Sequence, residues 1–249
     1  MNHFESKLGK IHYLKEGNKK KVLLLLHGLS YNSDIFRKYL PFFQENHTII
    51  IPDLPGHGHS ERLKKFPKTY FQDCADVILD LLKHENAKKV SIIGISAGAI
   101  IAFNMAAKAP KLIDKVVADS FPGRKISNGN LDLIIEETKK RSKSLLFRLR
   151  LKSMHGKDWK TIVDNHLDFL ESLKYSDYRI VVPELDKVKS KILLTGSTRY
   201  SMVPSLEPVY KKLKDKHPDL KISLFKDGAH PSFLSNRKKF LLEIRSFIS

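Results

Sequence analysis

The sequence predicts an α/β fold in which a mostly parallel sheet is covered by helices on both faces. Short apolar runs alternate with segments of helical periodicity along most of the chain. Several runs, such as Val22–Leu26, are apolar at every position, which is typical of strands buried on both faces. The chain has 249 residues, 41% of them hydrophobic, and is therefore long enough to bury a substantial core. Together these observations favour a doubly wound α/β architecture.

The predicted strands are short apolar stretches bounded by polar or turn residues. Residues Phe4–Leu14 contain two of them, which turn at Leu8-Gly9-Lys10. The remaining predicted strands are Val22–Leu26, Thr48–Ile51, Val90–Ile95, Lys115–Ala118, Ile192–Leu194 and Ile222–Phe225.

The predicted helices carry apolar residues at intervals of three and four. Tyr70–His84 shows this spacing most clearly. Ala97–Lys108 is rich in small residues and ends before Pro110, as expected because proline cannot continue a helix. The other predicted helices are Asp34–Phe43, Pro204–Lys216 and Asn236–Ile248.

The stretch Phe121–Asp186 interrupts the alternation, because it shows no clear strand. We therefore expect residues 1–120 and 187–249 to form the α/β core, and residues 121–186 to form a helical cap. In open α/β sheets ligands bind beyond the carboxyl ends of the strands, so an insertion after Lys115–Ala118 would lie above the site. The only tryptophan, Trp159, falls in this insertion, and we expect it to pack inside the cap.

The chain is strongly basic, with 45 Lys and Arg residues against 27 Asp and Glu residues and a net charge of +18. The charge is spread over the whole sequence, which favours a lysine-rich surface over a nucleic-acid partner. One stretch, Lys139–Lys152, interleaves basic residues with leucines. It is typical of a helix with one solvated and one packed face, although such a helix could also lie on an anionic membrane or attract acidic substrates.

Two features indicate the compartment. The apolar run Val22–Leu26 is far shorter than the roughly 20 residues that a membrane-spanning helix needs, and the charged start has no apolar segment behind it. The single cysteine, Cys74, excludes an internal disulfide and is typical of a reducing compartment or of a protein that needs no disulfides. We expect a cytoplasmic protein without stable membrane insertion; the sequence leaves its oligomeric state open.

The motif with the clearest chemistry is Gly94-Ile95-Ser96-Ala97-Gly98, a Gly-x-Ser-x-Gly pattern between a predicted strand and a predicted helix. A sharp turn of this kind lifts a serine hydroxyl clear of the sheet, and glycine is needed where side chains would collide. It also leaves the Ala97 N–H at a helix start, where it can stabilise developing negative charge. A tight glycine turn that only packs a helix on a strand is the alternative.

A second backbone donor is predicted at His27-Gly28-Leu29, which ends the strand Val22–Leu26. Gly28 allows the backbone to approach a ligand, so the Leu29 N–H is a candidate partner of the Ala97 N–H in an oxyanion hole. Without the serine motif, an ordinary turn at the end of a strand would explain this segment equally well.

His230 is the candidate general base, because Asp227-Gly228-Ala229-His230-Pro231 follows the last predicted strand. A histidine there lies on the same sheet edge as Ser96 and could take the serine proton. His57 and His59 lie on a glycine-rich turn without a nearby set of cysteines or carboxylates, so we interpret them as loop residues and expect no metal.

Together these residues resemble the α/β-hydrolase family, from Val22 to the end of the chain. The resemblance rests on His27-Gly28, the Asp53–Ser60 turn, the Ser96 motif and Gly228-Ala229-His230. It implies an eight-stranded, mostly parallel sheet, a lid inserted after the sixth strand, and a triad in the order serine, acid, histidine. The branch it resembles contains small esterases, carbon–carbon hydrolases and haloperoxidases.

The sequence departs from the family at the acid. The resemblance places that residue after the seventh strand, but Arg199 occupies the position and no acid appears before Glu207. Asp119, at the end of Lys115–Ala118, is the best substitute, because some family members carry the acid after the sixth strand. A chain without the acid, or with another residue in its place, is the alternative.

The sequence thus predicts a serine hydrolase that cleaves a small ester or related acyl substrate through an acyl-enzyme on Ser96. His230 acts as general base, Asp119 orients it, and Leu29 and Ala97 form the oxyanion hole. This chemistry requires no metal or organic cofactor. The alternatives are carbon–carbon hydrolysis or perhydrolysis on the same residues, a non-catalytic ligand-binding member of the fold, and a protein that binds an anionic surface or nucleic acid.

Overall fold

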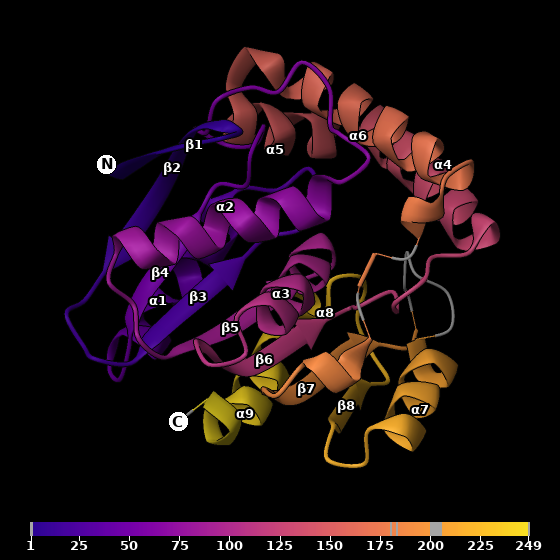
Figure 1. Cartoon of the computed structure of the whole chain (residues 1–249). Coiled ribbons are helices and arrows are strands. Elements are labelled where there is room, and N and C mark those ends of the chain that lie inside the picture. Colours follow the sequence, from indigo (N-terminus) through magenta and orange to yellow (C-terminus); the bar gives the residue numbers. More distant parts are fainter. Residues whose placement is uncertain (1, 180, 183, 200–205, 249) are drawn as a thin grey trace.

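A computed structural model describes residues 2–179, 181–182, 184–199 and 206–248. It confirms the α/β prediction with an eight-stranded sheet in the order β1-β2-β4-β3-β5-β6-β7-β8 (Figure 1). Neighbours are antiparallel from β1 to β4 and parallel from β4 to β8. The strands are β1 Asn2–Ser6, β2 Gly9–Glu16, β3 Val22–Leu26, β4 Thr48–Pro52, β5 Val90–Ile95, β6 Ile113–Asp119, β7 Lys191–Ser197 and β8 Lys221–Phe225.

Helices cover both faces of this sheet (Figure 1). On one face α2, α3 and α7 pack against alternate strand residues such as Leu24 and Leu26, and on the other α1, α8 and α9 pack against Leu23 and Leu25. This alternation explains why the inner strands are apolar at every position. The helices are α1 Leu40–Gln44, α2 Tyr70–His84, α3 Ala97–Lys108, α4 Asn128–Lys143, α5 Leu145–His155, α6 Trp159–Lys174, α7 Leu206–Lys216, α8 Ser232–Ser235 and α9 Arg237–Ile248.

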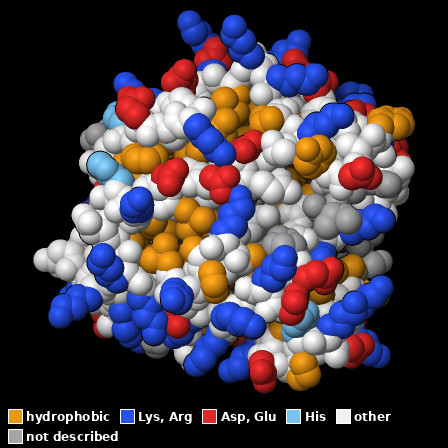
Figure 2. Space-filling view, viewed as in Figure 1, with side chains coloured by type: hydrophobic (Ala, Val, Ile, Leu, Met, Phe, Trp, Pro, Cys, Tyr) orange, Lys and Arg blue, Asp and Glu red, His pale blue; other side chains and the backbone are white. Residues whose placement is uncertain are grey.

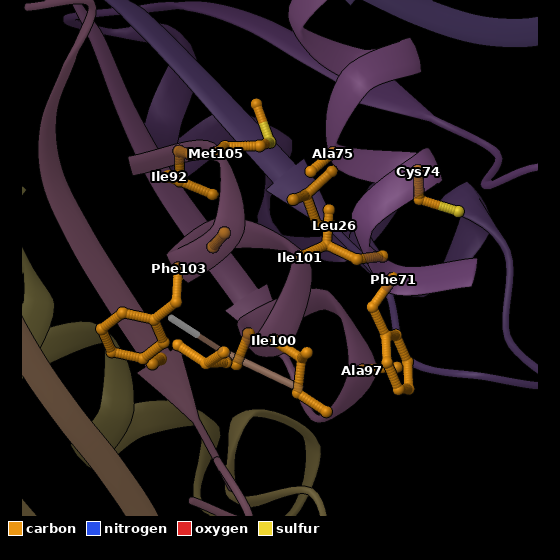
Figure 3. Packing of buried hydrophobic residues seen from close by; sticks show 14 of the residues in the cluster. Leu26, Phe71, Cys74, Ala75, Ile92, Ala97, Ile100, Ile101, Phe103 and Met105 are labelled. Carbon is orange, nitrogen blue, oxygen red and sulfur yellow. The ribbon is translucent and has the colours of Figure 1, made fainter. Parts of the chain in front are cut away.

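Helix α3, which begins directly after Ser96, is the most buried helix in the molecule. It packs against α2 and against strands β5 and β6, and Ile100, Ile101, Phe103 and Met105 are all within the core (Figure 3). Its alanines leave room for this close approach to neighbouring elements. The start of the helix is therefore held rigidly, which fixes the turn that precedes it.

The segment predicted as one helix, Asp34–Phe43, consists of two elements. A 3₁₀ helix runs over Ser33–Tyr39, and its start is capped by the Asn32 side chain, which accepts a hydrogen bond from Asp34 N at 3.2 Å. Helix α1 then begins afresh with Pro41 in its first turn. Because proline lacks an N–H, it suits the start of a helix and not its interior. The helical prediction for Asp34–Phe43 therefore holds, but the helix changes from 3₁₀ to α at Leu40.

The basic stretch Lys139–Lys152 is also divided. Helix α4 ends at Lys143, Ser144 is extended with φ −68° and ψ 129°, and α5 begins at Leu145. Helix α5 packs on the core through Leu151 and Met154, so residues on its other side lie in solvent. The leucines expected to form a packed face are therefore largely exposed, namely Leu145, Leu146 and Leu149.

Helices α4, α5 and α6 form the segment between β6 and β7, which we call the helical insertion (residues 121–186). They lie beyond the carboxyl ends of the parallel strands (Figure 1). The insertion shares apolar clusters with the core, through Leu131 and Leu170 on one side and Leu151 on the other. Trp159 is half-buried and packs against the second of these clusters, as expected for a packing residue.

The basic residues are widely distributed on the surface, and Figure 2 shows lysine and arginine side chains over the whole of the visible face. They are interspersed with acidic side chains and do not gather into one continuous patch in this view. Within the described parts of the chain, none of the helices combines the length and the apolar character that crossing a membrane would require.

Candidate active site

Ser96 lies at a sharp turn between β5 and α3. Its backbone has φ 54° and ψ −112°, a left-handed conformation that a non-glycine residue rarely adopts. Glycine is required at both flanking positions: a Cβ on Gly94 would come within 2.4 Å of the Gly98 carbonyl oxygen, and one on Gly98 within 2.3 Å of the Leu26 carbonyl oxygen. The steric argument from the sequence motif therefore holds, and the turn presents the serine side chain at the sheet edge.

Ser96 and His230 line the same cavity, which encloses about 760 Å³ including its open mouth. Its walls come from the sheet edge and from the helical insertion, and they are mainly apolar. The apolar lining residues include Phe71, Ile95, Ile100, Ile126, Ile134 and Leu170. A cavity of this kind is suited to a small ligand with an extended apolar part.

The predicted oxyanion donors line this cavity too. A Cβ on Gly28 would lie 3.4 Å from the Ser96 Cβ, so the turn after β3 approaches the serine closely. Among the described residues, the N–H groups of Leu29 and Ala97 have no hydrogen-bond acceptor. Ala97 is the first residue of α3, where backbone N–H groups are unpaired and the helix dipole favours negative charge.

The helical insertion holds the residue after Leu29 in place. Ser30 has a φ of 61°, and its Oγ lies 2.9 Å from Nδ1 of His166 in α6. His155, at the end of α5, accepts from Gly58 N–H on Nδ1 at 3.1 Å, so its Nε2 donates to the Ser30 carbonyl at 3.2 Å. Burial lowers the pKa of both histidines to about 4, and they are therefore neutral at pH 7.

The loop that carries His230 is fixed by hydroxyl groups. Ser197 Oγ lies 2.7 and 2.6 Å from the carbonyl oxygens of Asp227 and Gly228 and can donate its one proton to either, and Ser235 Oγ donates to the Ala229 carbonyl at 2.6 Å. Burial and the nearby charge of Arg141 lower the pKa of His230 to about 3, so the ring is neutral. Its Nδ1 atom is buried and has no hydrogen-bond partner in the described part of the chain.

Asp119 does not orient His230 by direct contact, so this part of the prediction is wrong. Its fully buried carboxylate accepts hydrogen bonds from the Thr195 hydroxyl at 2.9 Å, from the Phe233 N–H at 3.1 Å and from the Ser232 hydroxyl. These donors come from β7 and α8 and occupy the oxygen atoms that a triad acid would offer to the imidazole. Asp119 instead anchors the chain immediately after His230.

Burial raises the pKa of Asp119 to about 6, although the hydrogen bonds from Ser232, Phe233 and Thr195 lower it. The carboxyl group is therefore mostly ionised at pH 7. Its backbone contributes to the site as well, because the Asp119 carbonyl accepts from Ser96 N–H at 2.8 Å. Asp119 thus connects the turn at Ser96 with the loop that carries His230.

Comparison with known proteins identifies the family. A family model described as the alpha/beta hydrolase fold matches residues 21–174, more than half of the chain. The chain belongs to the α/β-hydrolase family. The strand order, the serine turn and the position of His230 after β8 agree with this assignment.

Relatives of this α/β-hydrolase include the uncharacterized hydrolase YugF of Bacillus subtilis, 34% identical over 43% of this chain and 38% of that protein. Serine hydrolase BPHL of Homo sapiens is also 34% identical, over 43% of this chain and 38% of that protein. The matched segment thus spans about two fifths of each relative. Among solved structures, an esterase from Exiguobacterium antarcticum superimposes with a TM-score of 0.78 and 18% identity, covering 99% of this chain and 98% of that one, and shows the shared fold.

This α/β-hydrolase departs from its family at the acid position after β7. Arg199 is exposed there, with a guanidinium nitrogen 3.9 Å from a carboxylate oxygen of Asp227. Glu207 lies on α7 and is exposed. Residues 200–204 of the segment singled out in the sequence lie outside the described residues. No described carboxylate is hydrogen-bonded to His230.

The Asp53–Ser60 turn of the family pattern has a structural role. The buried carboxylate of Asp53 accepts from His12 Nδ1 at 2.9 Å and from the N–H groups of Ser33 and His59 at 2.7 and 2.8 Å. Burial alone would raise the pKa of Asp53, but these bonds and the neighbouring His27 hold it below its ordinary value. His57 is buried and interacts with the Pro55 carbonyl, and no group of three or more potential ligands in the described chain could hold a metal.

Three residues of the site had not been identified from the sequence. Thr195 lies opposite Asp119 in the parallel pairing of β6 and β7, so strand register could have placed it. Ser232 follows His230 by two residues, but nothing in the sequence shows which way its hydroxyl points. Arg141 lines the cavity beside His230, and within a stretch of many basic residues no pattern distinguishes it.

Proposed function

We propose that this α/β-hydrolase is a serine hydrolase that cleaves a small ester or related acyl substrate. The observation that carries the proposal is the convergence of Ser96, His230 and two unpaired backbone N–H groups on one mainly apolar cavity. A nucleophile, a base and a pair of oxyanion donors are the parts that acyl transfer requires. The relatives named hydrolases support the same class of reaction.

In the proposed reaction, neutral His230 takes the proton of the Ser96 hydroxyl as Oγ attacks the ester carbonyl. The N–H groups of Leu29 and Ala97 stabilise the resulting oxyanion. When the tetrahedral intermediate collapses, the carbon–oxygen bond to the leaving group breaks and His230 protonates the departing alkoxide. A water molecule, deprotonated by His230, then attacks the acyl-enzyme and releases the carboxylic acid and free Ser96.

In this mechanism Asp119 is a positioning residue. It holds the chain after His230 through Ser232 and Phe233 and the turn before Ser96 through its carbonyl. An imidazole without a carboxylate on Nδ1 is less well oriented and its protonated form is less stabilised. Loss of the acid from a serine triad lowers turnover by about 10⁴-fold, so we expect slow turnover.

The proposal is tested by labelling with a fluorophosphonate probe and by hydrolysis of p-nitrophenyl acetate and butyrate. We expect label on the wild type and on Ser153→Ala, which alters an exposed serine of α5, and no label or activity with Ser96→Ala. A Ser96→Ala protein that retains wild-type activity would refute the mechanism.

A second function is favoured by the unpartnered Nδ1 atom of His230, namely a ligand-binding member of the fold without catalysis. The same probe separates the two, because a fluorophosphonate reacts only with an activated serine. Covalent labelling of Ser96 would exclude the binding function. A folded wild-type protein that is not labelled and hydrolyses neither ester would favour the ligand-binding function over the hydrolase function.

A further inference from the structure

The cavity and its mouth carry an unbalanced positive charge. The cavity lined by Ser96 continues into an outer pocket, and the two share Tyr31, Arg141, Phe147 and His230. Among the described residues that line either space, the ionised side chains are Arg141 and Arg150, and there is no carboxylate. Arg141 alone of these two arginines lines the inner cavity together with the serine.

The Arg141 guanidinium has no ion pair or side-chain hydrogen bond within the described residues, although the residue is only partly exposed. The nearest carboxylate along its helix face, Glu137, lies 3.8 Å from the ammonium of Lys140 instead. Arg150 differs, because its guanidinium lies over the Tyr31 ring at 5.2 Å from the centroid. A partly buried cation loses part of its hydration without gaining a partner in the protein, so a bound anion would stabilise it.

We propose that Arg141 is the anion-binding residue of this site and that the substrate is an ester whose acyl part carries a carboxylate. The inference rests on the proposed hydrolase function and names its substrate class. A guanidinium binds a carboxylate through two parallel hydrogen bonds. The single guanidinium that the described residues contribute to the inner cavity matches the one negative charge of a carboxylate.

The rest of the cavity agrees with this substrate. Apart from its few polar groups the lining is apolar, with residues such as Ile134, Ile126 and Ile100, and this suits a substrate with a short methylene chain. The Thr138 hydroxyl, which lines the cavity from α4, donates to the Ile134 carbonyl at 2.7 Å, so its proton is already used within the helix. Arg141 and His230 both line the inner cavity and the outer pocket, and the guanidinium is close enough for its charge to lower the pKa of the ring.

The test compares two p-nitrophenyl esters of equal chain length, the neutral valerate and the anionic hydrogen glutarate. In Arg141→Gln we expect kcat/KM for the glutarate ester to fall about 10- to 100-fold, the range of one charged hydrogen-bonded pair. The valerate value should stay the same or rise, because this ester has no carboxylate for Arg141 to bind and the variant removes a charge that opposes protonation of His230. Retained valerate hydrolysis also shows that the variant is folded. Arg148→Gln, on an exposed residue of α5, is the matched control and should behave as wild type with both esters.

A binding measurement keeps the inference separate from the proposed function. Calorimetry on the Ser96→Ala protein should detect monomethyl glutarate, and adding Arg141→Gln should weaken this binding at least tenfold. If the wild type hydrolyses neither ester, the proposed function fails, and this binding still decides the anion site. The anion site alone would be overturned if Arg141→Gln changed kcat/KM by the same factor for both esters. It would also be overturned if the affinity for monomethyl glutarate were unchanged by this substitution.

Discussion

Replacing His166 with glutamine should make the protein less sensitive to acid. His166 connects α6 to Ser30, beside the predicted oxyanion donor Leu29, and its ring is almost completely buried. Burial lowers its pKa from the ordinary 6.5 to about 4. Between these two values the unfolded chain binds a proton that the folded protein excludes, so stability is lost as the pH falls.

The size of this effect follows from the two pKa values. On lowering the pH from 7 to 5, protonation of the unfolded state at this one histidine removes about 2 kcal/mol from the free energy of unfolding. Glutamine does not titrate, yet its amide can still hydrogen-bond the Ser30 hydroxyl. The His166→Gln protein should therefore lose about 2 kcal/mol less than the wild type over this interval, with a difference at pH 7 of about 1 kcal/mol or less.

The measurement is urea denaturation at pH 7 and pH 5 for the wild type, His166→Gln and His59→Gln. The exposed ring of His59 makes it a matched control, and this variant should show the same loss as the wild type. If His166→Gln and the wild type lose the same free energy between the two pH values, then His166 is not held neutral by burial. The connection between α6 and Ser30 that we describe would then be wrong.

Three substitutions test the framework of the site. Ser232→Ala removes a hydroxyl donor from the buried Asp119 carboxylate and should lower the free energy of unfolding by about 1–3 kcal/mol in thermal or urea denaturation. Gly98→Ala would place a Cβ 2.3 Å from the Leu26 carbonyl oxygen, so we expect a loss above about 3 kcal/mol, or no soluble folded protein. Gly129→Ala, in α4 with nothing within 4 Å of the new Cβ, should raise stability by about 0.5–1 kcal/mol; an equal loss in both glycine variants would contradict the steric argument.

The inner strands were predictable because a strand buried on both faces has apolar residues at every position. In β3 every residue is apolar, and the predicted range Val22–Leu26 is the observed one. The helix Tyr70–His84 was likewise predicted with its observed ends, since one face packs on the core and the other is solvated. The apolar pattern did not show where the backbone changes, namely from 3₁₀ to α helix before Pro41 and from helix to an extended residue at Ser144.

The site was predictable as far as strand topology extends. Parallel strands deliver their carboxyl ends to one edge, so Ser96 and Asp119 were certain to be neighbours once the strand order was right. The partner of a buried carboxylate is decided differently, by which donors lie within about 3 Å. The hydroxyls of Thr195 and Ser232 hydrogen-bond the Asp119 carboxylate. No sequence pattern shows that these hydroxyls, and not the His230 ring, are its partners.

The arrangement around Asp119 has a chemical consequence. Because its oxygens are occupied by neutral donors, the carboxylate cannot stabilise a positive charge on His230 by contact, while Arg141 opposes that charge. The imidazolium that must form when Ser96 is deprotonated is therefore disfavoured in the empty site. A substrate carboxylate seated on Arg141 would cancel this opposition, so the charge that binds the substrate would also make His230 a better base. The specificity for an acidic substrate and the efficiency of proton transfer to His230 would then both depend on the guanidinium of Arg141.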